Sequence, residues 1–207
     1  KGQIMSKFAD IYGHEQIKEH LQNAIRLNKV SHAYIFNGPM GSGKKMTAGI
    51  FAETLQCEQH GQEPCGTCHS CIQSESGNQP DIIWVHHEKP GSIGVDDVRE
   101  QVIGDMQIKP YSSRYKIYII DEAEKLTPQA QNALLKTIEE PPAYGIIILL
   151  TTNADTFLQT ILSRCVRLDF RPLRDTLVTQ YLQEKYDLTD YECRFATAFA
   201  QGKIGRA

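Results

Sequence analysis

The sequence predicts an α/β protein with a five-stranded parallel sheet, followed by a small α-helical domain. Three observations support this fold class. Apolar runs of strand length alternate with segments of helical spacing up to residue 170, only helical spacing continues beyond Pro172, and a glycine-rich loop joins the first strand to the next helix. Strands that alternate with helices are typical of parallel sheets with right-handed crossovers.

Each element follows from its own local pattern. The strands are expected at the apolar runs 33–36, 81–85, 116–120, 146–152 and 166–170. The helices are expected where apolar residues recur every three or four positions, at 14–27, 44–56, 95–103, 128–138, 173–182 and 193–200. Thr127-Pro128 supplies an N-cap and a first turn, and Glu140-Pro141-Pro142 stops that helix. In the last helix, Cys193, Ala196, Phe199 and Ala200 are expected on the packed face.

Composition limits the size and the location of the protein. The 207 residues are 41% hydrophobic and carry a net charge of -3, which suffices for one core with a small appendage and gives no overall basic field. No apolar run approaches the ~18 residues of a membrane span, and no signal peptide opens the chain, so a cytoplasmic protein without membrane contact is expected. Residues 1–4 precede Met5 and are expected to be a tag remnant. The main domain is expected at 5–170 and the helical domain at 171–207, with the natural protein continuing further.

A phosphate-binding loop (P-loop) is the strongest motif, and it departs from the usual pattern at its last position. Such a loop needs glycines, a lysine for the phosphates, and a Ser or Thr hydroxyl for Mg²⁺. The chain supplies Gly38, Gly41, Ser42, Gly43 and Lys44, but Lys45 takes the hydroxyl position. An ammonium group has no lone pair for a metal. The loop is therefore expected to hold ATP or ADP, with Mg²⁺ doubtful and hydrolysis weak; a ligand-free turn from strand to helix is the alternative.

Two carboxylates follow the strand at 116–120. Asp121 is placed for the Mg²⁺ shell of a P-loop ATPase, and Glu122 for polarising an attacking water. Acidic residues also occur at strand ends simply because they are solvated there, and that alternative stays open.

Four cysteines form a module at residues 57–71. Cys57, Cys65, Cys68 and Cys71 match a tetrahedral structural zinc site, which leaves no coordination position for a catalytic water. Two disulfides or an iron–sulfur cluster are the alternatives.

Several motifs together resemble the AAA+ subunits of bacterial DNA polymerase III clamp loaders, and among them the delta-prime subunit. They are Ser31-His32-Ala33-Tyr34, the cysteine module, the segment 95–99, the run from Asp121-Glu122 through Leu134-Leu135-Lys136 to Glu139-Glu140-Pro141-Pro142, and Ser163-Arg164-Cys165. The resemblance covers almost the whole chain and implies a AAA+ domain with a RecA-like core, a zinc-binding insertion and a helical lid. It also implies that a C-terminal collar domain is absent from this sequence.

The resemblance implies roles for single residues. Thr152 or Asn153 is similar to the sensor of the γ-phosphate, Arg206 to a second sensor, and Arg164 to an arginine finger that reaches a neighbour's ATP. The alternative for Arg164 is a surface arginine paired with an acidic residue. The implied partners are the tau/gamma and delta subunits in a hetero-pentamer, the sliding clamp and primer-template DNA. Lys136 and Arg114, with Ser112, Ser113 and Lys116, are candidates for DNA phosphate contacts. The alternative for Lys136 is an ordinary solvated lysine on a helix.

Two subunits of that complex fit the sequence. Lys45 favours delta-prime, a largely non-hydrolysing stator that offers Arg164 to the adjacent motor and helps to load the clamp during replication. The alternative is the ATP-hydrolysing tau/gamma motor, which resembles this chain in the zinc module, the Asp121-Glu122 pair and Ser163-Arg164-Cys165.

Overall fold

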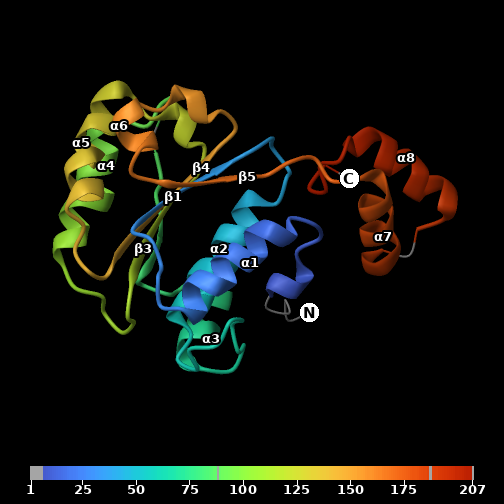
Figure 1. Ribbon diagram of the computed structural model, residues 1–207, viewed down its shortest axis with the longest axis horizontal. Helices are drawn as coiled ribbons and strands as arrows, with labels where there is room; N and C mark the ends of the chain where they lie inside the picture. Colours follow the sequence, from blue (N-terminus) through green and yellow to red (C-terminus); the bar gives the residue numbers. More distant parts are fainter. Residues whose placement is uncertain (1–6, 88, 187, 207) are drawn as a thin grey trace.

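The computed structural model describes residues 7–87, 89–186 and 188–206, so the expected tag remnant at 1–4 lies outside the described residues. Figure 1 shows a layered α/β body with a pair of helices beside it. Five strands form the sheet: β1 Ala33–Asn37, β2 Ile82–Trp84, β3 Lys116–Ile120, β4 Gly145–Thr151 and β5 Val166–Asp169. Each lies at a predicted apolar run, within one or two residues at either end.

The sheet is wholly parallel, as predicted, and its strands follow the order β2-β3-β4-β1-β5. In this order β4 lies between β1 and β3, with Tyr34 opposite Ile148 and Tyr118 opposite Ile147. The carboxyl ends of β1, β3 and β4 therefore meet at one edge, where ligands bind in open α/β sheets. The P-loop, Asp121 and Thr152 follow these three strands.

Helices cover both faces of the sheet (Figure 1). Their bounds are α1 Glu15–Arg26, α2 Lys44–Gln56, α3 His69–Glu75, α4 Val95–Val98, α5 Pro128–Glu139, α6 Gln159–Leu162, α7 Asp175–Lys185 and α8 Asp190–Ala200. Thr127 caps α5 as predicted, because its hydroxyl accepts the N–H of Ala130.

The strands are apolar throughout because they contribute to two cores. On β3, Ile117 and Ile119 pack with α1 and α2, whereas Tyr118 and Ile120 pack with α4 and α5. Alternate residues of a strand point to opposite faces, so a strand covered on both sides has no polar face.

The helix expected at 95–103 is not uniform. α4 ends at Val98 and the chain continues as a π-helical segment, Arg99–Gly104. A side chain at position 104 would lie 3.1 Å from the carbonyl oxygen of Arg99, a closeness that glycine relieves. Val98, Val102 and Met106 stay on the buried side through the change of helix type.

The predicted final helix pair is present, but the packed face of α8 differs from the prediction. Cys193, Thr197 and Ala200 are buried, whereas Phe199 is 56% exposed. A pair of helices has one shared face, and the shorter side chains fill it against Val178 and Leu182 of α7. Within the described residues, no helix is both long and apolar enough to cross a membrane.

Candidate functional site

The P-loop connects β1 to α2 in a conformation that requires glycine. Gly41 and Gly43 have φ values of 78° and 91°, which side chains rarely adopt. The N–H of Gly38 donates to the carbonyl of Thr151 at 3.1 Å and so fixes the loop beside the end of β4. The first N–H groups of α2 have no partner within the helix and form an anion site with its dipole.

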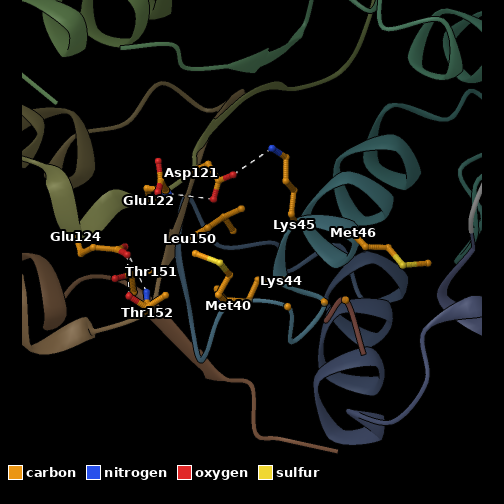
Figure 2. A pocket seen from close by; sticks show the side chains of 13 residues that line it. Met40, Lys44, Lys45, Met46, Asp121, Glu122, Glu124, Leu150, Thr151 and Thr152 are labelled. Atoms are coloured by element: carbon orange, nitrogen blue, oxygen red, sulfur yellow. Dashed lines mark hydrogen bonds and ion pairs between the residues drawn. The ribbon is translucent and has the colours of Figure 1, made fainter. Parts of the chain in front are cut away.

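A cavity of about 400 Å³ lies over this loop (Figure 2). The described residues that line it are Met40, Gly41, Gly43, Lys44, Lys45, Met46, Asp121, Glu122, Glu124, Leu150, Thr151, Thr152 and Gly205. The fold thus brings together the predicted P-loop lysines, the predicted acidic pair and one of the two predicted sensor residues.

Lys44 is drawn back onto the loop. Its ammonium group donates to the carbonyl oxygens of Gly38 and, at 2.8 Å, of Pro39. Burial lowers the pKa of Lys44, while the carboxylates of Glu124 and Asp121 act in the opposite sense. The side chain lies in the right place for a phosphate and is held there by neutral oxygens.

Lys45 forms an ion pair where a metal would bind in a complete P-loop site. Its Nζ lies 3.1 Å from Asp121 Oδ2 and 5.2 Å from the centre of the Trp84 ring. Figure 2 shows the two charged groups facing each other. The Lys45 ammonium group therefore supplies positive charge to Asp121 in place of a metal ion.

Glu122 is turned toward a lysine of its own loop. Its backbone is left-handed, with φ 51°, and Oε2 lies 2.7 Å from Lys125 Nζ and 3.8 Å from His87 Nε2. The carboxylate still lines the cavity, and one of its two oxygens, Oε2, is paired with Lys125.

Glu124 belongs to the site and was missed from the sequence. It accepts hydrogen bonds from the hydroxyl of Thr152 at 2.7 Å and from its N–H at 3.3 Å. Burial opposes ionisation, yet these hydrogen bonds hold the pKa of Glu124 below its ordinary value. The only available signal was a third carboxylate shortly after the Asp121-Glu122 pair.

The two candidates for the γ-phosphate sensor, Thr152 and Asn153, lie in different surroundings. Thr152 lines the cavity, whereas the side chain of Asn153 accepts the N–H of Asp155 and caps the 3₁₀ turn Ala154–Thr156. In the C-terminal segment, Gly205 lines the cavity and donates its N–H to the carbonyl of Gly41 at 2.9 Å. The Arg206 guanidinium instead lies 4.4 Å from the centre of the Phe199 ring, so its sensor role stays a prediction.

A second cavity, of about 480 Å³, adjoins the P-loop between the first residues of the chain and the helix pair. It is lined by Asp10, Ile11, Tyr12, His14, Ser42, Gly43, Met46, Tyr181, Lys185 and Ile204. The Ser42 hydroxyl beside it is buried and has no hydrogen-bond partner among the described residues. The P-loop thus separates a charged cavity from a larger, partly apolar one.

The four predicted cysteines lie together at the N-terminal end of α3, where Cys68 is the N-cap residue and Cys71 lies in the first turn. Their sulfur atoms all lie within 4.8 Å of one another, with 3.9 Å between Cys65 and Cys71. A tetrahedral zinc site with Zn–S bonds of ~2.3 Å places sulfurs about 3.8 Å apart. The N–H of Thr67 helps to lower the pKa of Cys65 to about 6, whereas burial raises the pKa of Cys57 and of Cys71. The donor set fits a structural zinc ion, whose charge would offset the buried thiolates.

Arg164 lies away from the cavity that its own chain forms. Its Nη2 is 2.8 Å from Glu139 Oε1, and its Nη1 donates to the carbonyl of Thr160 at 2.9 Å. The side chain is 39% exposed, directly after α6.

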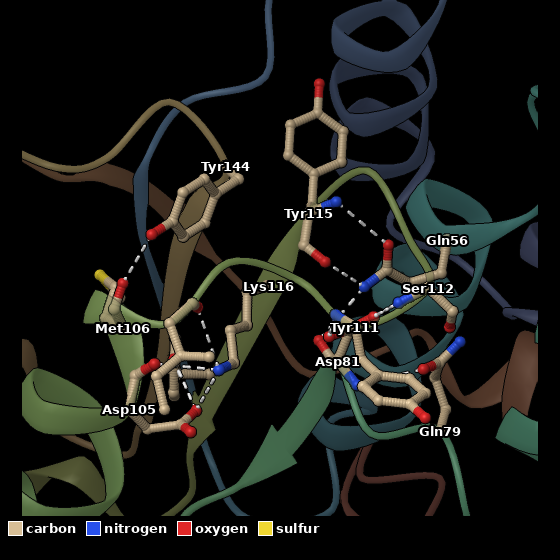
Figure 3. A network of polar contacts seen from close by, with 12 residues as sticks. Gln56, Gln79, Asp81, Asp105, Met106, Tyr111, Ser112, Tyr115, Lys116 and Tyr144 are labelled. Atoms are coloured by element: carbon tan, nitrogen blue, oxygen red, sulfur yellow. Dashed lines mark hydrogen bonds and ion pairs between the residues drawn. The ribbon is translucent and has the colours of Figure 1, made fainter.

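Of the DNA candidates, Lys136 and Arg114 are exposed, but Lys116 is not available. Lys116 Nζ is buried beside β3, 2.8 Å from Asp105 Oδ2, and it also donates to two carbonyl oxygens (Figure 3). Its assignment as a phosphate contact was wrong, because a lysine at the start of a buried strand finds its counter-ion inside the fold.

The buried carboxylate of Asp81 anchors the loop that carries Arg114 (Figure 3). This carboxylate is fully buried and accepts the N–H groups of Tyr111, Ser112 and Ser113 at 2.7, 2.9 and 3.1 Å. Arg114 itself donates to the side chain of Asn28 at 2.7 Å. The backbone donors of both serines are therefore already used.

Known proteins resemble this chain in sequence and in fold. The DNA polymerase III subunit tau of Bacillus subtilis is 40% identical over 182 residues, which are 87% of this chain and 32% of that protein. The tau/gamma subunit of Haemophilus influenzae is 39% identical over 204 residues, 95% of this chain and 29% of its own length. The chain thus spans about a third of these relatives.

Solved structures agree on the fold. A gamma subunit-related protein from Thermotoga maritima has a TM-score of 0.53 at 24% identity, covering 90% of this chain and 58% of its own. The RuvB Holliday junction branch migration motor of the same organism has a TM-score of 0.60 at 16% identity, covering 94% and 59%. The α/β domain is AAA+-like, as the resemblance implied.

A family profile described as "DNA polymerase III, delta subunit" matches residues 13–174, most of the chain. The two relatives described above are named tau and tau/gamma, and not delta-prime. The chain therefore belongs to the DNA polymerase III delta-subunit family, within the gamma, tau and delta group of clamp-loader subunits.

Proposed function

We propose that this chain is a clamp-loader subunit that binds a nucleotide with little or no hydrolysis and acts on a neighbour's ATP through Arg164. This is the role of a delta-prime stator. The single observation that supports it is the ion pair between Lys45 and Asp121. Hydrolysis in P-loop ATPases needs Mg²⁺ held by the loop hydroxyl and by an acidic residue. Here the hydroxyl is absent and the acid is paired.

The nucleotide would bind across the two cavities. Its phosphates fit over the P-loop beside Lys44, and its base and sugar fit the partly apolar cavity between Ile11 and Ile204. The unpartnered Ser42 hydroxyl supports a polar ligand at the junction. Arg206 would reach this ligand only by leaving Phe199.

The wider assembly is part of the proposal. We expect partnership with tau/gamma and delta subunits in a hetero-pentamer that loads the sliding clamp onto primed DNA. Arg164 suits action in trans, since it lies outside its own chain's cavity and is partly exposed. Zinc fastening α3 through the four cysteines, and DNA contacts by Lys136 and Arg114, belong to the same proposal.

The second candidate is an ATP-hydrolysing tau/gamma motor, and the names of the relatives favour it over a stator. Lys44, Asp121 and Glu122 all line the cavity, as a motor requires. The two candidates differ in whether this chain turns over ATP by itself.

Steady-state ATPase of the purified subunit with primed DNA separates them. The stator predicts no turnover above that of a Lys44→Ala variant. Turnover that is lost in Lys44→Ala would establish the motor instead. Labelled-ATP binding to both proteins shows whether an inactive site still holds nucleotide.

A further inference from the structure

We infer that Glu139 is a positioning residue that orients the Arg164 guanidinium toward a phosphate group on a neighbouring subunit. The inference rests on the proposed action of Arg164 in trans and adds to it Glu139, a residue of another helix.

Three contacts fix the guanidinium on one side. Nη2 lies 2.8 Å from Glu139 Oε1, and Nη1 donates to the Thr160 carbonyl at 2.9 Å and to the Ser163 hydroxyl at 3.2 Å. A guanidinium group has five N–H donors. Within the described part of the chain, these contacts use at most three, so two donors are left for an external oxyanion.

The backbone explains why the two side chains meet. α5 ends at Glu139, because Glu140 leaves the helical conformation ahead of Pro141. A carboxylate at a helix C-terminus is unfavourable beside the helix dipole, and a nearby cation offsets this. Arg164, just past the end of α6, supplies that cation and also binds a carbonyl of its own helix.

The ion pair between Glu139 and Arg164 can orient the guanidinium group without preventing it from binding a phosphate. The two side chains are 39% and 43% exposed, which places the ion pair among those that solvent screens strongly. A phosphate group that approaches Arg164 meets stronger, charge-assisted and bidentate hydrogen bonding. It can therefore bind the open donors while Glu139 and Thr160 keep the guanidinium plane in place.

The test uses the complex reconstituted with tau/gamma-type and delta-type partners, loaded in turn with the unaltered chain, Glu139→Gln, Glu140→Gln and Arg164→Ala. Arg164→Ala should lower the DNA-stimulated kcat of the complex by about 10³-fold or more, as loss of an arginine finger does. Glu139→Gln should lower kcat by about 10- to 100-fold through misplacement alone, with KM for ATP little changed. Glu140→Gln is the matched control and should leave kcat unchanged.

A double variant distinguishes positioning from a structural effect. Glu139→Gln added to Arg164→Ala should cause no further loss, because the residue that it orients is gone. Full kcat in Glu139→Gln, a raised kcat, or a further loss in the double variant would each overturn this inference. If Glu139→Gln does not assemble, Glu139→Asp is measured by the same criteria. Unchanged kcat in Arg164→Ala would instead refute the proposed finger, which is a separate outcome.

Discussion

Replacement of Lys45 by threonine is the most informative perturbation of this protein, because it restores the missing hydroxyl and frees Asp121 in one step. The side chains of Lys45 and Asp121 are 69% and 40% exposed, and their charged atoms lie 3.1 Å apart. Because water reaches both groups, their Coulomb attraction is close to the value for a charge pair in bulk water, about 1 kcal/mol. Loss of this attraction would therefore raise the affinity of the Asp121 carboxylate for Mg²⁺ by about fivefold.

Two variants distinguish the effect of removing the ammonium charge from the effect of adding a metal ligand. Lys45→Met removes the ammonium group without adding a ligand, so Mg²⁺ should tighten ATP binding by about fivefold more than in the unaltered chain. Lys45→Thr also adds a metal ligand and should gain at least about tenfold beyond that. Because the exposed ion pair contributes only about 0–1 kcal/mol to stability, both variants should fold normally.

The assay is equilibrium binding of ATP in EDTA and in Mg²⁺. The chain has one tryptophan, and the Trp84 ring lies 5.2 Å from Lys45 Nζ, so intrinsic fluorescence reports directly on this site. In the unaltered chain, ATP affinity should be almost independent of Mg²⁺. If Mg²⁺ raises the ATP affinity of the unaltered chain as much as that of Lys45→Thr, then Lys45 does not impair metal binding at this site.

Three further predictions concern stability. Asp81→Asn should lower the free energy of unfolding by about 2–3 kcal/mol in urea titrations, because an amide NH₂ group in place of Oδ2 cannot accept the N–H groups of Ser112 and Ser113. The exposed Asp96→Asn should change it by less than about 0.5 kcal/mol, and equal effects would contradict the anchoring role. Metal analysis should find about one zinc per chain, and chelation should lower the melting temperature; an equally stable metal-free protein would exclude a structural site. Burial raises the pKa of Glu53 from 4.5 to about 7, so the folded state keeps a proton that the unfolded chain has lost, and stability should fall as pH rises between these values. Glu53→Gln should therefore gain about 1–2 kcal/mol relative to the unaltered chain between pH 5 and pH 8, after allowance for partial solvent exposure; a constant difference would refute this.

The choice between subunits shows where motif reasoning was limited. Lys45 alone favoured delta-prime, while similarity over most of the chain favours tau and tau/gamma relatives. A single residue such as Lys45 indicates what chemistry a site can perform, whereas sequence identity over most of the chain indicates which proteins share its ancestry. The ATPase measurement is needed because these two kinds of information differ here.

The sequence by itself determined the five strands, the P-loop and the four-cysteine cluster. Each is encoded locally, by an apolar run, by glycines at left-handed positions or by the spacing of thiols, so neighbours along the chain suffice to identify it. Only the tertiary structure decided how the charged groups pair. Lys45 meets Asp121, Glu124 holds Thr152, Lys116 turns inward to Asp105, and Arg164 meets Glu139. Coulomb energy and hydrogen bonding depend on distance through space, and for these residues the order of the strands and the ends of the helices set that distance.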